Sequence, residues 1–172
     1  MKIRPASSIS ESSYPTFFPH ITIAALPPEF SVDRLKCSIP KLLDCLPVSF
    51  CSIDVGSHFF RSVYISVQPT DALLSLHAAV HAALEIAPRT PLFPHISLCY
   101  ITDEDAILGE RDKYYRELES TGKFRSEESG GVSLNTGEDD WMSGFLSPEL
   151  WITDCTGPVE AWSVVEIIQL NK

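Results

Sequence analysis

The chain has 172 residues, 44% of them hydrophobic, and a formal net charge of -10. This length and composition predict one domain with a buried core, large enough to divide into two lobes. The negative charge opposes non-specific binding of long polyanions such as duplex DNA or an anionic membrane surface, but not binding of a small anion in a local basic pocket.

The predicted elements include helices, hairpins and strands, which indicates an α+β fold. Residues 1–16 are rich in Ser and Pro and are expected to be irregular. In chain order, the expected elements are a strand over 17–26, a helix over 31–46, strands over 48–55 and 58–67, a helix over 71–87, a strand over 92–101, a helix over 103–119, and final strands over 145–155 and 160–170.

Capping residues and helix breakers suggest some of these boundaries. Ser31 or Asp33 can cap the first helix, and Pro40 is expected to end or kink it. Gly56-Ser57 is expected to form the turn between the two strands that flank it.

Residues 126–140 are a polar segment of low complexity. They include five acidic residues and no Lys or Arg. A segment of this composition buries too little apolar surface to offset the entropy lost on ordering. We therefore expect a mobile acidic insertion loop.

A weak internal repeat organises the chain. The sequence FFPHITIA at 17–24 is similar to LFPHISLC at 92–99, and the two histidines lie 75 positions apart, at 20 and 95. Self-similarity at this spacing suggests a duplicated lobe. Because side chains alternate along a strand, each copy presents a histidine and a hydroxyl on one face, namely His20 with Thr22 and His95 with Ser97.

Two imidazoles that converge on one cleft are suited to phosphoester hydrolysis. In-line displacement at phosphorus needs a base on one side and an acid on the other, and histidine can be either near neutral pH. The hydroxyls of Thr22 and Ser97 can donate to non-bridging oxygens, and this chemistry needs no metal or other cofactor. One histidine alone in a strand is more often a hydrogen-bonded structural residue, but two matching copies favour a catalytic role. The near symmetry of the two motifs leaves open which histidine is the acid.

The two motifs, His20-Ile21-Thr22 and His95-Ile96-Ser97, resemble those of the two-histidine (2H) phosphoesterase superfamily. The sequences HFFRSVYISVQP (58–69), PHISLCY (94–100) and CTGPVEAWSVVEI (155–167) are similar to the fungal 2′,3′-cyclic-nucleotide 3′-phosphodiesterases, the CPDases. The resemblance covers roughly residues 17 to 170. It implies a single bilobal domain over 1–172, with two antiparallel sheets facing a central cleft and helices on the outside.

The resemblance also implies an activity. CPDases hydrolyse ADP-ribose 1″,2″-cyclic phosphate, a by-product of tRNA splicing, to ADP-ribose 1″-phosphate, and nucleoside 2′,3′-cyclic phosphates to nucleoside 2′-phosphates. It assigns catalytic roles to His20 and His95 and substrate binding to Thr22 and Ser97. Tyr100 is expected on the phosphate side. Phe59 or Phe60 is expected to stack on the base. Apart from the resemblance, a single cyclic phosphate needs about one cation, for which Arg61 or Arg89 is the candidate.

One feature departs from the family pattern. Family members usually open with a full strand well before the first motif, whereas 19 Ser-rich residues precede His20. Either that strand is degenerate or the chain start is truncated.

Two other functions compete with this interpretation. One is a 2H enzyme that acts on RNA ends, which the negative charge disfavours. The other is a non-catalytic nucleotide-binding module, which the presence of both histidines and both hydroxyls disfavours. The expected partner is therefore a small cyclic phosphate rather than a long nucleic acid, and the expected state is a monomer.

The remaining histidines and cysteines are assigned structural or surface positions. His77 and His81 have a spacing that can bind zinc, but no third ligand is evident, so a solvated helix flank is expected. Cys99 is expected to pack in the core. Five cysteines without a C-x-x-C pair indicate reduced thiols in an intracellular, cytoplasmic protein. No apolar run approaches the ~20 residues that span a bilayer, although the family resemblance allows Golgi association in fungi.

Overall fold

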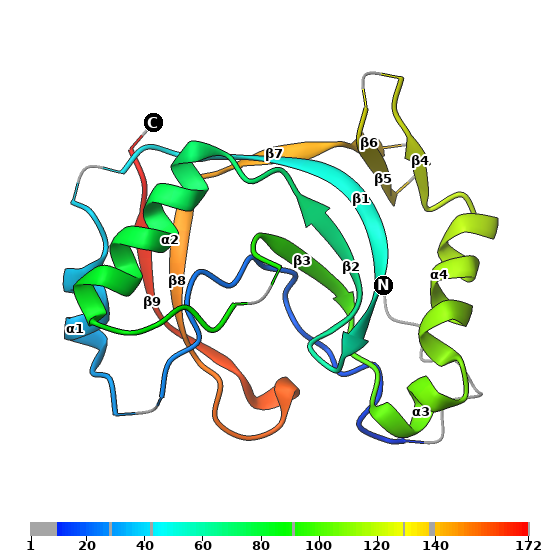
Figure 1. The fold of residues 1–172 in the computed structure, drawn as a ribbon, viewed down its shortest axis with the longest axis horizontal. Helices are drawn as coiled ribbons and strands as arrows, with labels where there is room; N and C mark the ends of the chain where they lie inside the picture. Colours follow the sequence, from blue (N-terminus) through cyan, green and yellow to red (C-terminus); the bar gives the residue numbers. More distant parts are fainter. Residues whose placement is uncertain are drawn as a thin grey trace. The chain divides into compact units, whose positions relative to one another are not determined.

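A computed structural model describes residues 10–27, 29–41, 43–90, 92–128, 130–137 and 140–171. They divide into two compact units, each made of three stretches of chain. The first unit comprises the described parts of 1–21, 49–67 and 95–144, and the second comprises those of 22–48, 68–94 and 145–172. Helices and antiparallel strands occur in both units (Figure 1), which confirms the α+β prediction.

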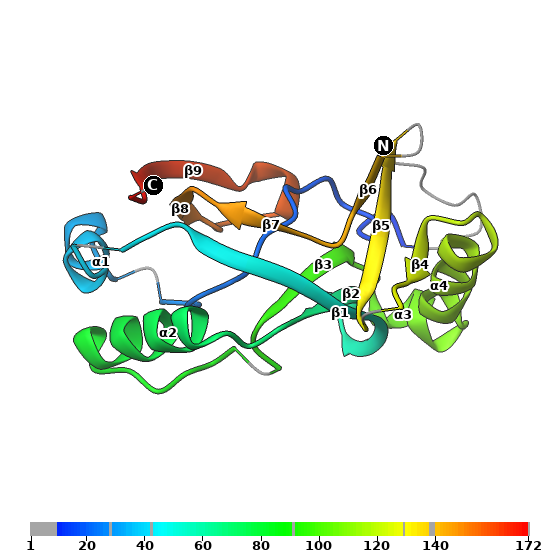
Figure 2. The ribbon, with the colours of Figure 1, turned by 90° about the horizontal axis from the view of Figure 1, so that it is seen from above.

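The first unit is built on an antiparallel sheet in which β2 lies between β3 and β1. The strands are β1 (Leu46–His58, whose first residues belong to the second unit), β2 (Arg61–Val67) and β3 (His95–Cys99). Helices α3 (Asp103–Ile107) and α4 (Glu110–Ser120) follow β3. Figures 1 and 2 show these two helices together at one end of the unit, where α4 packs against β2.

The second unit contains a helix pair and a two-stranded ribbon. Helix α1 (Val32–Ser38) packs against α2 (Asp71–Leu84). The chain enters this unit again along β7 (Gly144–Ser147) and forms β8 (Glu149–Asp154), the short 3₁₀ helix η1 (Val159–Ala161) and β9 (Ser163–Gln169), with β8 and β9 antiparallel. The two final strands were expected, with somewhat longer bounds.

Local sequence signals set the ends of α1. The Ser31 hydroxyl accepts a hydrogen bond from the Arg34 N–H at 3.3 Å, as expected for a cap. The helix ends at Ser38, two residues before Pro40, and Ile39 is already extended. Because the residue before a proline is biased away from helical dihedrals, Pro40 ends α1 well short of the predicted residue 46.

The first copy of the repeat is not the strand that was predicted over 17–26. Its only sheet pairing among the described residues is an isolated antiparallel bridge between Ile21 and Ile96. Pro19 contributes to this outcome because it has no N–H to donate to a neighbouring strand. Within the described residues, this copy thus pairs with the edge of β3 through a single bridge.

The predicted turn at Gly56-Ser57 is wrong. Strand β1 continues to His58, which pairs with Arg61, so the turn consists of Phe59 and Phe60. A Cβ at Gly56 would lie 2.1 Å from the Arg61 carbonyl oxygen. The glycine therefore permits a close approach at an irregularity of the hairpin, which sequence reasoning mistook for a turn.

The helix predicted over 103–119 is two helices. Leu108 and Gly109 separate α3 from α4, and Gly109 has a φ of 82°. Glycine adopts this left-handed conformation without the steric cost that a Cβ adds. The charged, amphipathic pattern continues across the break, so periodicity alone could not reveal it.

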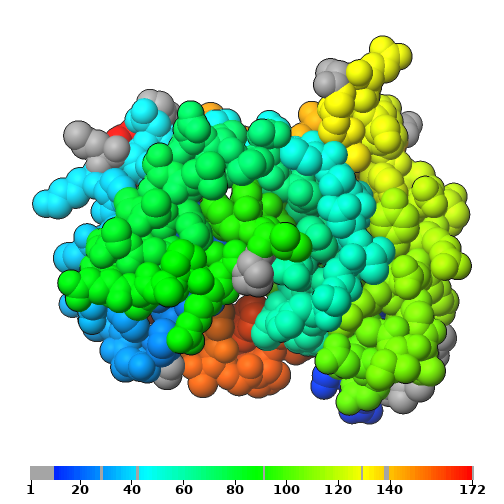
Figure 3. All heavy atoms as spheres, in the orientation of Figure 1, coloured from blue at the N-terminus to red at the C-terminus, as the bar shows by residue number. Residues whose placement is uncertain are grey.

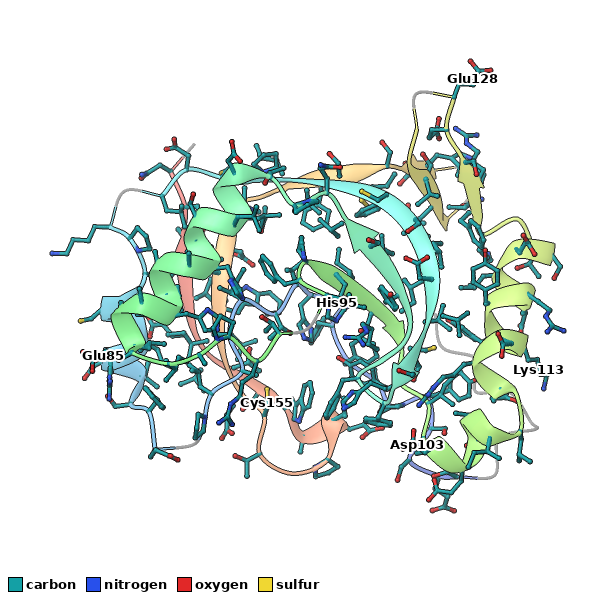
Figure 4. All side chains as sticks on the ribbon, in the orientation of Figure 1. Glu85, His95, Asp103, Lys113, Glu128 and Cys155 are labelled. Atoms are coloured by element: carbon teal, nitrogen blue, oxygen red, sulfur yellow. The ribbon has the colours of Figure 1, made fainter. Side chains whose placement is uncertain are left out.

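The segment 126–140, expected as a loop, is instead largely strand. It contributes to a three-stranded sheet of β4 (Phe124–Ser126), β5 (Val132–Gly137) and β6 (Asp140–Met142). Figure 4 shows Glu128 at the outer end of the connection between β4 and β5, and Figure 3 shows this connection projecting beyond α4. The acidic composition of the segment led to the prediction of a loop, although its apolar residues Val132 and Leu134 lie in β5. The predicted mobility stays a prediction.

Candidate active site

The central sheet of the first unit has one apolar face. Ile53, Ile65 and Ile96 stand opposite one another across β1, β2 and β3, and all three are buried. The bridge between Ile21 and Ile96 adds the first motif to this row. Burial of the isoleucines fixes the register, because a shift by one residue would turn every side chain to the other face.

The same register makes the other face polar. Residues directly opposite each other in an antiparallel pair share a face. Ser66 stands opposite both Ser52 and His95, while Tyr64 stands opposite both Asp54 and Ser97. The polar face therefore carries six side chains from three strands: Ser52, Asp54, Tyr64, Ser66, His95 and Ser97.

His95 is the first residue of β3 and is half-buried (Figure 4). Its imidazole lies against the Tyr64 ring, with the ring centroids 5.5 Å apart and the planes at 73°. An edge-to-face contact of this kind is a favoured arrangement of aromatic rings. It restricts how the imidazole can turn.

His20 is exposed and approaches the same sheet from its edge. The antiparallel sense of the Ile21–Ile96 bridge puts His20 in register with Ser97. The Nδ1 of His20 lies 2.6 Å from the Phe18 carbonyl oxygen. Because a carbonyl only accepts, Nδ1 carries a proton, and in the neutral ring Nε2 is then the basic nitrogen.

The two motif hydroxyls are not equivalent. Ser97 is buried, and its hydroxyl donates to the Phe60 carbonyl oxygen at 2.6 Å. That proton becomes available to a phosphate only if the side chain rotates. Thr22 is half-buried and belongs to the second unit.

Aromatic side chains surround Tyr100, directly after β3. Phe17 stacks on the Tyr100 ring with centroids 4.0 Å apart, and Phe59 and Phe60 contact it at 5.5 and 5.4 Å. Tyr100 is only 3% exposed, whereas Phe60 is 45% exposed. Phe60 therefore offers accessible ring surface, and Tyr100 is the buried ring that the other aromatic side chains contact. Sequence reasoning missed Phe17, although its place at the start of the first repeat marked it.

The site also contains a tyrosine that the sequence analysis did not single out. The Arg61 guanidinium lies over the Tyr64 ring, 5.7 Å from its centroid. Burial raises the pKa of the Tyr64 phenol, the Asp54 charge raises it further, and Arg61 opposes the shift. Tyr64 is therefore a neutral hydroxyl at physiological pH. Arg89, the other cation considered, is exposed in the second unit.

Buried polar contacts anchor the chain before the first motif. The Tyr14 N–H donates to the Tyr100 carbonyl at 2.8 Å, and its hydroxyl donates to Glu110 at 3.1 Å. The Ser13 hydroxyl donates to Asp105, 1% exposed, at 2.6 Å. Irregular structure was expected over 1–16, of which 1–9 lie outside the described residues. Residues 10–16 contain no helix or strand, but Ser13 and Tyr14 are buried and hydrogen-bonded.

The prediction of a solvated flank for His77 and His81 is wrong. His81 is 4% exposed and its Nδ1 donates to the His77 carbonyl at 2.7 Å. His77 stacks on Phe93 at 4.3 Å and lies 2.7 Å from the Thr90 hydroxyl. The pair packs the helix onto the segment that precedes β3. Cys99 is buried, and burial raises the pKa of its thiol to about 12, which supports the expected core role.

Comparison with known proteins gives the family. A family model described as a cyclic phosphodiesterase-like protein matches residues 3–170. A 2',3'-cyclic-nucleotide 3'-phosphodiesterase of Yarrowia lipolytica is 25% identical over 204 residues, covering 96% of this chain and 87% of the relative. A cyclic phosphodiesterase of Arabidopsis thaliana is 28% identical over 110 residues, covering 61% of this chain and 60% of the relative.

The chain therefore belongs to the cyclic phosphodiesterase-like family. Membership confirms the resemblance to the CPDases and the expectation of an enzyme that hydrolyses phosphoric diesters. Across the described ranges, no helix is both long and apolar enough to cross a membrane.

Proposed function

We propose that this enzyme hydrolyses nucleoside 2′,3′-cyclic phosphates to nucleoside 2′-phosphates, and ADP-ribose 1″,2″-cyclic phosphate to ADP-ribose 1″-phosphate. His20 and His95 act as its acid–base pair, without a metal. The observation that carries the proposal is the Ile21–Ile96 bridge, which brings the first motif alongside the strand that begins with His95. The names of the relatives support the cyclic nucleotide as substrate.

The chemistry needs one neutral and one protonated imidazole. The neutral histidine takes a proton from water as the water oxygen attacks phosphorus. The bond from phosphorus to the 3′-oxygen breaks, and the protonated histidine gives its proton to that oxygen. The two histidines then exchange protons with solvent to restore their starting states. Rotation of Ser97 away from the Phe60 carbonyl would let its hydroxyl donate to a non-bridging oxygen.

Small substrates suit this surface better than long RNA. The basic residues of α4 are the densest cluster in the sequence, yet Arg111 is buried and donates to Asp103 at 2.9 Å. Lys113 lies 3.5 Å from Glu110, and Figure 4 shows it pointing outward from α4. Cations engaged in this way do not form a track for successive phosphates.

We also propose a location and an oligomeric state for the enzyme. All five cysteines are free thiols, which supports a reducing, cytoplasmic compartment. A small substrate also needs no second subunit to bind it, and we expect a monomer in tRNA-splicing by-product metabolism.

Phosphorus NMR of the products tests the proposal. The purified enzyme, in excess EDTA, is given 2′,3′-cyclic AMP and ADP-ribose 1″,2″-cyclic phosphate. We expect a 2′-phosphate and a 1″-phosphate as the only products. The kcat/KM of the small substrates should be at least as high as that of an oligonucleotide that ends in a 2′,3′-cyclic phosphate. A 3′-phosphate product, abolition by the chelator, or a tenfold preference for the oligonucleotide that grows at low salt would refute it.

A further inference from the structure

Tyr64 lies where the functional groups of the first unit meet. Its ring contacts the His95 imidazole at 5.5 Å and lies under the Arg61 guanidinium at 5.7 Å. On β1, the position of a Cβ on Gly56 would be 3.3 Å from Cε1 of the same ring. One aromatic ring thus contacts a catalytic candidate, a cation and a glycine that leaves room for it.

The sheet register gives this ring little freedom. Tyr64 stands opposite Asp54 on one side and Ser97 on the other, and it is 8% exposed. The Asp54 carboxylate accepts a 2.7 Å hydrogen bond from Ser52 on the same strand. A side chain confined by both neighbouring strands can hold a contacting group in one orientation.

We propose that Tyr64 is a positioning residue that holds the His95 imidazole and the Arg61 guanidinium against one buried ring. The inference rests on the proposed function, in which His95 moves a proton. Arg61 is a cation that the sequence offers for holding the phosphate. The ring carries the effect: its face attracts the guanidinium, and its contact with the imidazole limits rotation. Loss of alignment lowers the rate steeply, because misplacement by about 1 Å can cost about a hundredfold.

Two substitutions separate the contribution of the Tyr64 ring from that of its hydroxyl. Tyr64→Phe keeps the ring, and we expect kcat on 2′,3′-cyclic AMP within about threefold of the unsubstituted enzyme. Tyr64→Leu removes the ring, and we expect kcat to fall by about tenfold or more, with KM changed less than about threefold. Tyr115→Leu is the matched control, because Tyr115 packs at 5.6 Å on Phe124 of β4, which belongs to a different sheet from Tyr64 and His95.

A measurement on the unsubstituted enzyme tests the geometry directly. We expect nuclear Overhauser contacts between the His95 imidazole protons and the Tyr64 ring protons, preserved in Tyr64→Phe. Their absence would overturn the proposal even if Tyr64→Leu fails to fold. Equal losses of kcat in the Phe and Leu variants, or a Leu variant with unchanged kcat, would also overturn it.

Failure of the proposed function gives a different pattern. If His95→Ala keeps its activity, the acid–base assignment is wrong, whatever the Tyr64 variants do. If His95→Ala is inactive while Tyr64→Leu and Tyr115→Leu have the same kcat, only the positioning role is wrong.

Discussion

The two copies of the repeated motif have nearly the same sequence but different structures. In the copy at 92–99, His95 begins a strand of the sheet, whereas the copy at 17–24 joins that strand through one bridge at Ile21. His20 is exposed and hydrogen-bonded to backbone, while His95 is half-buried against an aromatic ring. The comparison shows that two nearly identical short sequences can adopt different structures when their surroundings differ.

The two hydrophobic positions before each Pro-His pair are used in opposite ways. In the first copy Phe17 stacks on Tyr100 and Phe18 is 73% exposed. In the second, Leu92 is 63% exposed and Phe93 stacks on His77. Each copy is therefore anchored by a different position, and neither anchor is evident from the alignment of the two copies.

The largest expected effect concerns the histidines themselves. His20→Ala and His95→Ala should each lower kcat by at least about a hundredfold, because each removes one proton transfer. The double variant should lose little more than either single variant, since the two act in one step. His58→Ala, an exposed histidine of the same unit, is the control, and steady-state kinetics checks all four. Retention of more than half the activity by either motif variant would break the functional equivalence of the copies.

The pH dependence sharpens that equivalence. Because one histidine must be neutral and the other protonated, kcat/KM should fall on both sides of an optimum. Each single His→Ala variant should lose one limb of the bell in its residual activity. A profile that stays bell-shaped in both variants would place the titrating groups elsewhere.

Substitutions at corresponding positions of the two copies should lower the free energy of unfolding by different amounts. Phe17→Ala and Phe93→Ala should each lower the free energy of unfolding by about 2 kcal/mol, because each removes a packed ring. Their counterparts in the other copy, Leu92→Ala and Phe18→Ala, should change it by less than about 0.5 kcal/mol. Urea denaturation of the four variants checks this, and equal losses at corresponding positions would show that the copies are anchored alike.

The smallest expected effect is a pH dependence of stability caused by His77, the residue on which Phe93 of the second copy stacks. Burial lowers the pKa of His77 below its ordinary value of 6.5, and His81 lowers it further. The unfolded chain then binds the proton more readily, so stability is present above about pH 6.5 and declines as the pH falls below it. His77→Gln should reduce this decline, measured by unfolding at pH 7.5 and 5.5, whereas His58→Gln should not. An unchanged decline in His77→Gln would mean that other groups cause it.

Much of the local structure and the chemistry could be predicted from sequence. The cap at Ser31 and the end of α1 before Pro40 follow from dihedral limits and one side-chain hydrogen bond. The family, and with it the phosphodiesterase activity, was predicted from two short motifs and the segments similar to the CPDases, and the family match confirms it. The pairing of His20 and His95 in catalysis stays a prediction. These features depend on residues close together in the chain.

The tertiary structure decided what depends on residues far apart. Only the register of β2 against β1 and β3 reveals Tyr64 between Asp54 and Ser97. Only the fold shows that the Ser97 hydroxyl donates to Phe60, 37 positions earlier. A sequence states which groups are present and their local preferences, but burial and register across strands determine which groups meet, because the contacts that stabilise them join distant parts of the chain.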